Sequence, residues 1–96
     1  PAYVFHLIEA MTAAGVAVGL PPDMAEQLAR KTVIGSALLA ADSSAIPAAT
    51  LRQNVTSPGG TTAAALDVLM NDKDGLGRLM TRAIEAATKR AKELSA

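Results

Sequence analysis

The feature that most constrains the fold of this chain is the helical spacing of its apolar residues, broken at a few points by proline and glycine. From Ala2 to Val18, apolar residues recur at steps of three and four, which places them on one helical face: Val4, Leu7, Ile8, Met11, Ala14 and Val18. Gly19 stands where a helix commonly ends in a left-handed residue, and Pro21 and Pro22 prevent continuation. The sequence therefore predicts a first helix that ends at this point.

A second helix is predicted from Pro22 to about Ala41. Proline is acceptable at a first helical position, and Asp23 and Glu26 place negative charge in the opening turn, where the helix dipole favours it. The later half, "VIGSALLA", is apolar or small on nearly every side. We therefore expect it to be surrounded by protein, and because a short chain encloses few positions, part of that protein is expected to be another subunit.

The rest of the chain also predicts helices rather than strands. A short helix is expected in "ATLRQNV", another from Thr61 to Met70, and a last one after the connector "NDKDGLG". The last helix has a basic end, "KRAK", suited to the negative pole of its dipole, and an apolar stripe that can pair with another helix: Leu76, Met80, Ala83, Ala87, Ala91 and Leu94. No segment alternates apolar and polar residues as a strand would. The prediction is a single all-α domain over residues 1–96, with about five helices.

Charge and composition exclude several classes of function. Nine basic and nine acidic residues cancel, so we expect neither a nucleic-acid partner nor a charge-bound membrane. There is no cysteine and only one histidine, His6, so no metal site is expected. No apolar run approaches the length of a membrane span, which favours a cytoplasmic protein. The opening "PAYVFHLIEAM" already looks like a buried helix and has no initiator methionine, so we expect the chain to be a piece of a longer protein.

The candidate site is the stretch "NVTSPGGTTAAAL", from Asn54 to Leu66. Pro58 fixes one backbone angle, while Gly59 and Gly60 permit conformations or close approaches that a β-carbon would bar. Thr61 and Thr62 then stand at the amino end of a helix, where unpaired N–H groups and the dipole favour a carboxylate or phosphate. Local sequence leaves a second interpretation open, an ordinary turn with a threonine cap.

The motif "NVTSPGGTTAAALDVL" resembles the signature of the pyrroline-5-carboxylate reductase family. Three further stretches are similar to the helical carboxyl-terminal region of that family and follow in the same order: "PAYVFHLIEAM", "AGVAVGLPPDMA" and "AIEAATKRAKEL". The resemblance implies a two-domain enzyme that uses NADPH or NADH to make L-proline. An amino-terminal Rossmann domain would bind the nucleotide, and an intertwined helical domain would form the homodimer and hold the substrate. Only the second domain is represented here, because the G-x-G-x-x-G fingerprint is absent.

Carried over residue by residue, the resemblance implies a substrate-binding set of Asn54, Val55, Ser57, Gly59, Gly60, Thr61 and Thr62. The backbone N–H groups around Gly60, Thr61 and Thr62 would bind the substrate carboxylate, with Ser57 nearby. The Thr62 hydroxyl matches the threonine that hydrogen-bonds the ring nitrogen, so it is the candidate catalytic group, orienting or polarising the imine. A hydroxyl is a poor general acid by itself, so water or an already protonated imine remains as the proton source. The glycines would let a small cyclic amino acid approach the backbone.

The chain departs from the family pattern in the loop before this motif. Family members often carry a glutamate three residues ahead of the loop proline, whereas here Ser44 has that spacing from Pro47. Asp42 is the nearby carboxylate that could take the same region.

Two other hypotheses of function stay open on the sequence. One is a helical oligomerisation module without a ligand, based on the apolar second helix and the stripe on the last helix. The other is a domain of a related cyclic-imine or hydroxyacid reductase, which shares the chemistry but not the substrate. In either reductase the 96-residue chain alone is expected to be inactive, because nothing in it positions a dinucleotide.

Overall fold

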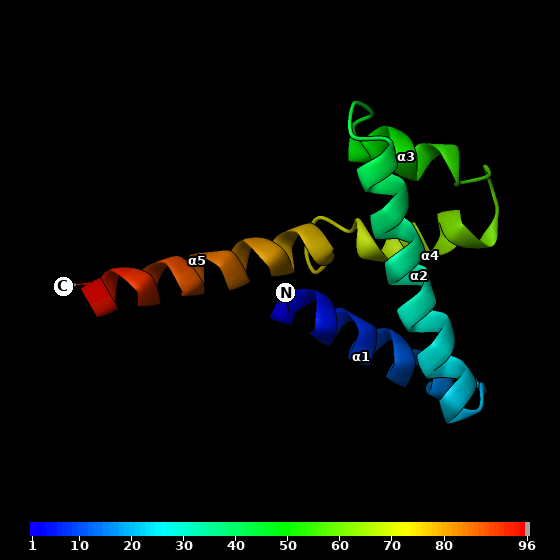
Figure 1. Ribbon diagram of the computed structural model, residues 1–96, viewed down its shortest axis with the longest axis horizontal. Coiled ribbons are helices and arrows are strands. Elements are labelled where there is room, and N and C mark those ends of the chain that lie inside the picture. The colour runs from blue at the N-terminus through cyan, green and yellow to red at the C-terminus, as the bar shows by residue number, and fades with distance from the viewer. Residues whose placement is uncertain (96) are drawn as a thin grey trace. The chain divides into compact units, whose positions relative to one another are not determined.

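Five helices make up the regular structure of residues 1–95, the range that the computed structural model describes (Figure 1). They are α1 (Ala2–Ala17), α2 (Pro22–Asp42), α3 (Ala48–Asn54), α4 (Thr61–Leu69) and α5 (Leu76–Ser95). No strand occurs within that range, so the predicted all-α fold is confirmed. The chain divides into two compact units, Pro1–Ala48 and Ala49–Ala96.

In the first unit, α1 and α2 pack against each other through a tight corner. The N–H of Gly19 donates to Val16 O at 3.0 Å, and the N–H of Leu20 donates to Gly15 O at 3.0 Å. This pair of bonds, with Gly19 at φ 112°, is the Schellman arrangement, and it confirms the left-handed glycine predicted at the helix end. The helix stops at Ala17, one residue before the predicted end at Val18.

Small residues bring the two helices of this unit close together. Ala25 and Ala29 on α2 are its buried apolar residues, only 2% and 4% exposed. A β-carbon added to Gly15 on α1 would lie 3.2 Å from the Ala25 Cβ, which shows how closely the backbones approach. The helix pair is therefore held by backbone proximity rather than by a core of large side chains.

The larger apolar side chains of α2 are left uncovered in the single chain. In the "VIGSALLA" half, Ile34 and Leu39 are about half exposed, and Leu38 is 66% exposed. A single chain therefore does not surround this half of the helix. Apolar surface on this scale is typical of a face that another protein covers.

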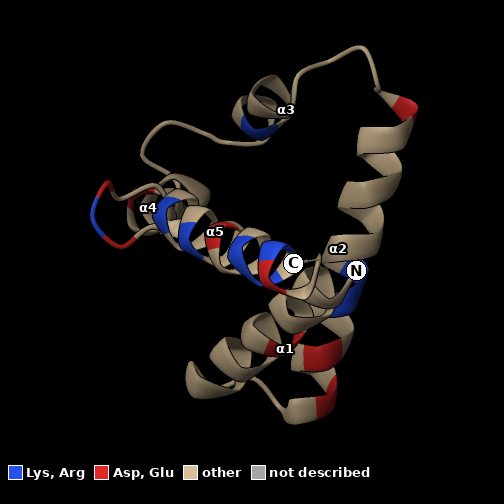
Figure 2. Cartoon of the chain, turned by 90° about the vertical axis from the view of Figure 1, so that its left-hand side faces the viewer, with Lys and Arg blue, Asp and Glu red and all other residues tan. Residues whose placement is uncertain are grey.

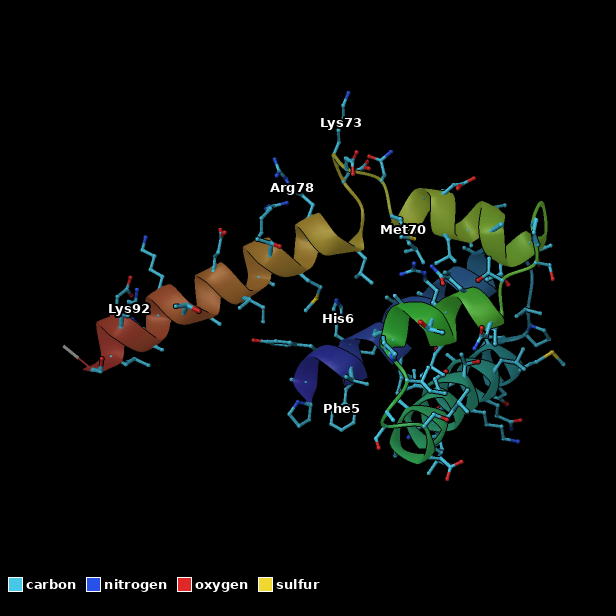
Figure 3. All side chains as sticks on the ribbon, turned by 90° about the horizontal axis from the view of Figure 1, so that it is seen from above. Phe5, His6, Met70, Lys73, Arg78 and Lys92 are labelled. Atoms are coloured by element: carbon cyan, nitrogen blue, oxygen red, sulfur yellow. The ribbon has the colours of Figure 1, made fainter. Side chains whose placement is uncertain are left out.

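The second unit consists of two short helices, α3 and α4, and the long helix α5. The basic residues predicted near the carboxyl end lie along α5 (Figure 2), and Arg78 and Lys92 project from it (Figure 3). The apolar side chains of α5 are uncovered here as well, since Leu76, Leu79, Ile84 and Leu94 are all exposed. Of the predicted stripe, Met80 is half-buried and the other members are exposed, and Leu79 and Ile84 add apolar surface that the prediction did not include.

The connector between α4 and α5 turns sharply around Gly75, which is buried. The Gly75 N–H donates to Asn71 O at 2.9 Å, and the Lys73 N–H donates to the Asn71 side-chain oxygen at 2.8 Å. A β-carbon on Gly75 would collide with the carbonyl oxygens of Leu69 and Asn71. The space at this position is thus taken by backbone that cannot easily move.

Candidate functional site

The stretch Ser57–Pro58–Gly59–Gly60 forms a hydrogen-bonded β-turn. The Gly60 N–H donates to Ser57 O at 3.0 Å, which closes the turn. Pro58 occupies the second position, where its fixed φ is favoured, and Gly59 occupies the third with φ 72°. A positive φ at the third position is the mark of a type II turn and is the reason that glycine is required there.

Gly60 is needed for a different reason, the crowding at its α-carbon. Its backbone is extended, with φ −84° and ψ −177°, and any residue can adopt that conformation. A β-carbon there would lie 3.2 Å from Ser57 O, which is tighter than an ordinary contact. The two glycines therefore have separate structural functions, one in the backbone angle of the turn and one in its close return on Ser57.

Helix α4 begins directly after this turn and leaves its first donors free. Gly60 is its N-cap, and the first intrahelical bond runs from the Ala64 N–H to Gly60 O at 3.1 Å. The N–H groups of Thr61 and Thr62 have no acceptor among the described residues. The Gly60 N–H, by contrast, donates within the turn. Of the three N–H groups predicted to bind the carboxylate, only those of Thr61 and Thr62 are therefore free.

No side-chain cap closes α4 within the described part of the chain. Thr61 and Thr62 are both exposed, and neither hydroxyl makes a hydrogen bond to residues 1–95. The threonine-cap interpretation that the sequence left open is therefore not observed. The amino end of α4 thus presents three N–H groups, of Thr61, Thr62 and Ala63, and two threonine hydroxyl groups without partners among the described residues.

The other residues that the sequence singled out are divided between the two units. Asn54 is the last residue of α3, and Val55 follows it with 65% of its surface exposed. Asp42 is the last residue of α2, and Ser44 comes two residues later, so both belong to the first unit. Ser44 has the spacing that the resemblance gives to the family glutamate, so that position carries no carboxylate.

Thr56 was not singled out from the sequence, although the structure ties it firmly to α3. Its hydroxyl donates to Arg52 O at 2.6 Å, and its N–H donates to Gln53 O at 3.1 Å. The available signal was the presence of a threonine just after a short helix, since such hydroxyls often bond to the carbonyl four residues back. The residue stands between the end of α3 and the start of the turn.

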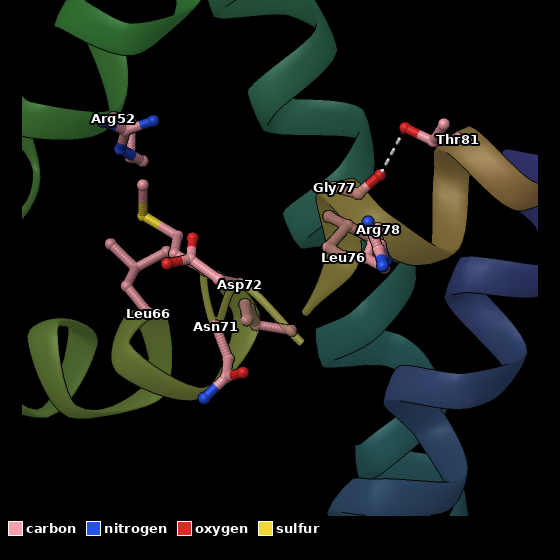
Figure 4. Close-up of a pocket in the computed structure, with 10 residues that line it drawn as sticks. Arg52, Leu66, Asn71, Asp72, Leu76, Gly77, Arg78 and Thr81 are labelled. Carbon is pink, nitrogen blue, oxygen red and sulfur yellow. Dashed lines mark hydrogen bonds between the residues drawn. The ribbon is translucent and has the colours of Figure 1, made fainter. Parts of the chain in front are cut away.

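A separate cavity of about 550 Å³ lies within the second unit (Figure 4). Its wall includes Arg52 of α3, the connector residues Asn71 and Asp72, and Arg78 and Thr81 of α5. The rest of its lining is largely apolar, from Leu66, Leu69, Met70 and Leu76. None of the residues of the Ser57–Thr62 turn lines it, so this cavity and the turn are distinct features.

The described residues include neither a cluster of metal ligands nor the glycine-rich turn of a Rossmann nucleotide site. Within residues 1–95, no three histidine, cysteine, aspartate or glutamate side chains gather as metal ligands would. Gly59 and Gly60 follow a helix and a turn, whereas a dinucleotide site needs a glycine-rich turn directly after a β-strand. The same range holds no helix with the length and apolar character needed to cross a membrane.

Fold and site together define an all-α domain with exposed apolar helix faces and a helix terminus suited to an anion. The chain matches the family described as pyrroline-5-carboxylate reductase dimerisation over residues 1–94, and it belongs to that family. The family resemblance inferred from the sequence is thereby confirmed.

Individual relatives agree with this assignment. The chain is 46% identical over 95 residues to a pyrroline-5-carboxylate reductase of Pisum sativum, covering 99% of this chain and 34% of that protein. It is 43% identical over 110 residues to the Mycobacterium leprae reductase, covering 98% of this chain and 37% of that protein. The chain therefore spans about a third of the length of these relatives.

A solved structure has the same fold. The Plasmodium falciparum pyrroline carboxylate reductase, crystallised with NADP bound, superimposes with a TM-score of 0.89 at 33% sequence identity. The match covers 100% of this chain and 36% of the Plasmodium chain. The helical arrangement described above is thus one that occurs in a reductase of this family.

Proposed function

We propose that this chain is the dimerising and substrate-binding domain of an enzyme that reduces 1-pyrroline-5-carboxylate to L-proline with NADPH or NADH. The single observation that carries the proposal is the amino end of α4. There, the N–H groups of Thr61 and Thr62 lack acceptors within the described chain, directly after a type II turn. A small anion is the ligand that such a terminus favours.

The substrate carboxylate is expected at this terminus. Unpaired N–H groups and the helix dipole together place partial positive charge there, worth about 0.3 to 1 kcal/mol for a nearby anion at an exposed site. Because Pro58 and the Ser57–Gly60 bond hold the turn, the donors are oriented before the ligand arrives. Such pre-organisation lowers the entropic cost of binding.

The Thr62 hydroxyl is the group that we assign to the ring nitrogen. It has no partner among residues 1–95 and stands on the same helical turn as the carboxylate donors. A substrate held by its carboxylate would therefore have its adjacent ring nitrogen within reach of this side chain. The hydroxyl orients the imine, and the proton on nitrogen comes from water or from the already protonated imine.

The reductant in this proposal is the nicotinamide, which supplies a hydride to the C=N carbon. Because the described residues lack the strand and glycine-rich turn of a Rossmann site, we assign the nucleotide mainly to another domain of the enzyme, which also chooses between NADPH and NADH. The contribution of this chain is to bind the substrate and fix its orientation.

The domain is also proposed to form an intertwined homodimer in a cytoplasmic enzyme. The apolar side chains of α2 and α5 are largely uncovered in the single chain. Buried apolar residues are confined to Ala25 and Ala29 in the described range. A second copy that covers these faces would provide the hydrophobic core that one chain lacks.

The test is a steady-state comparison of three variants of the full-length enzyme. Thr62→Val should lower kcat/KM for 1-pyrroline-5-carboxylate roughly 10- to 100-fold, the cost of a lost hydrogen bond to a charged ligand. Thr62→Ser should retain most activity because it keeps the hydroxyl. Thr81→Val is the matched control, since Thr81 also lies in the second unit but uses its hydroxyl within α5, on Gly77 O.

A double variant that carries both Thr62→Val and Gly60→Val and keeps parent-level activity would overturn the assignment of the site. Activity higher on a six-membered than on a five-membered cyclic imino acid would instead point to a related imine reductase. The isolated 96-residue chain should oxidise no NADPH with either substrate.

A helical oligomerisation module without a ligand is the second candidate, favoured by the exposed apolar faces of α2 and α5. It predicts that L-proline leaves the backbone amide signals of residues 57–62 unmoved in NMR spectra while the protein still dimerises. The proposed function predicts that the Thr61 and Thr62 amide signals move.

A further inference from the structure

Thr56 joins α3 to the Ser57–Gly60 turn through two hydrogen bonds. Its hydroxyl donates to Arg52 O at 2.6 Å, and its N–H donates to Gln53 O at 3.1 Å. Both acceptors are carbonyls of the last turn of α3, which have no partners within the helix itself. The half-buried Thr56 hydroxyl thus shares Arg52 O with the Val55 N–H, which donates to it at the longer distance of 3.3 Å.

Two further hydrogen bonds lie between the next residue, Ser57, and α4. Ser57 O accepts the Gly60 N–H at 3.0 Å, and Gly60 O accepts the Ala64 N–H at 3.1 Å. Since Pro58 has a fixed φ, the segment between Thr56 and α4 has few free rotations. Because Thr56 is joined directly to Ser57, a shift of the Thr56 backbone would be passed along the chain to the turn and to the first N–H groups of α4.

We infer that Thr56 is a positioning residue, whose hydroxyl fixes, through α3, the direction in which the N–H groups of Thr61 and Thr62 face the substrate carboxylate. The inference rests on the proposed function. Thr56 is not assigned to the substrate carboxylate, because its only hydroxyl donor is already used on Arg52 O.

The hydroxyl can be removed with little change of shape. In the full-length enzyme, Thr56→Val keeps the branched side chain and loses the donor, while Thr56→Ser keeps the donor. A third variant, Thr56→Ala, also lacks the donor and avoids any misfit of the second valine methyl. The matched control is Thr32→Val on α2, where the same type of bond runs from Thr32 Oγ1 to Leu28 O at 2.7 Å.

The expected result is a change in substrate binding that the control does not show. Thr56→Val and Thr56→Ala should raise KM for 1-pyrroline-5-carboxylate roughly fivefold, the range expected for one lost hydrogen bond. The KM for the nucleotide should stay unchanged, and Thr56→Ser should lie within about twofold of the parent. Thr32→Val should leave both KM values at the parent level.

Two results would overturn the inference. In the first, Thr56→Ala has the KM of the parent and a melting temperature lowered as much as that of Thr32→Val. The hydroxyl would then contribute only to stability. Failure of Thr56→Ser to restore KM would show that the hydroxyl is not the operative group. A parent enzyme that does not reduce 1-pyrroline-5-carboxylate at all would refute the proposed function instead, so the two failures are distinguishable.

Discussion

The two units of this chain use small residues for opposite purposes. In the first unit, Gly15, Ala25 and Ala29 let α1 and α2 approach each other, so that small side chains hold a helix pair together. In the second unit, Gly59 and Gly60 shape a turn that presents the free N–H groups of α4. Small residues therefore mean close packing in one unit and an accessible backbone in the other, and only the second use suits a ligand.

Among substitutions of small residues in the two units, Gly75→Ala in the second unit is expected to lower the stability most. The new β-carbon would lie 2.5 Å from Leu69 O and equally close to other backbone atoms, which cannot rotate away as a side chain would. We expect the free energy of unfolding to fall by more than about 2 kcal/mol. Urea denaturation followed by circular dichroism would measure it.

Gly77→Ala is the control for that variant. Gly77 has no atom within 4 Å of an added β-carbon and lies inside α5. Alanine there should stabilise the helix by up to about 1 kcal/mol. Equal effects of the two substitutions would contradict the account of the connector.

Ala25→Leu tests the packing of the first unit. Ala25 is only 2% exposed, and its Cβ lies 3.2 Å from where a β-carbon on Gly15 would be, so a longer side chain would press on α1. Overpacking of this kind should cost about 1 to 3 kcal/mol in thermal denaturation. Leu28→Ala is the control, because it makes a side chain of the same helix smaller and adds no crowding. If Ala25→Leu is as stable as the parent, α1 and α2 are free to separate.

Gly59→Ala should have a smaller effect on stability and a clearer one on the site. The positive φ of 72° disfavours alanine by about 1 to 2 kcal/mol, although the added β-carbon meets no neighbouring atom. In the full-length enzyme, we expect a clear fall in reductase activity under conditions where the variant remains fully folded. A variant with unchanged KM for the imino acid would separate the turn from substrate binding.

The smallest effect is expected from Glu26→Gln on α2. Glu26 and Arg30 form an ion pair at 2.8 Å, one helical turn apart and largely in contact with solvent. Such pairs contribute about 0.3 to 0.5 kcal/mol, and salt screens them. Equilibrium denaturation at low and high salt should show a small loss that disappears at high salt, and a loss above about 1 kcal/mol would contradict this estimate.

Some of these structural features could be predicted from the sequence, and others could not. The helices and the left-handed Gly19 followed from apolar spacing and from the residues that stop a helix, which are local properties. The use of the Gly60 N–H within the turn was not predictable, because it depends on where Ser57 O lies. The crowding at Gly75 was equally hidden, since a connector sequence does not show which carbonyls fold back on it.

The candidate site could be chosen from the sequence because its residues form one short segment. The turn and the first residues of α4 are contiguous, so Ser57 to Thr62 could be chosen together. Thr56 was missed because its role depends on a bond to Arg52, which is hidden until α3 is seen to end at Asn54.

The most direct test of the central claim is a crystal structure of the full-length enzyme with L-proline bound. The account predicts the proline carboxylate within hydrogen-bonding distance of the Thr61 and Thr62 N–H groups, and the ring nitrogen beside the Thr62 hydroxyl. A proline bound elsewhere, with the amino end of α4 contacting only water, would contradict it.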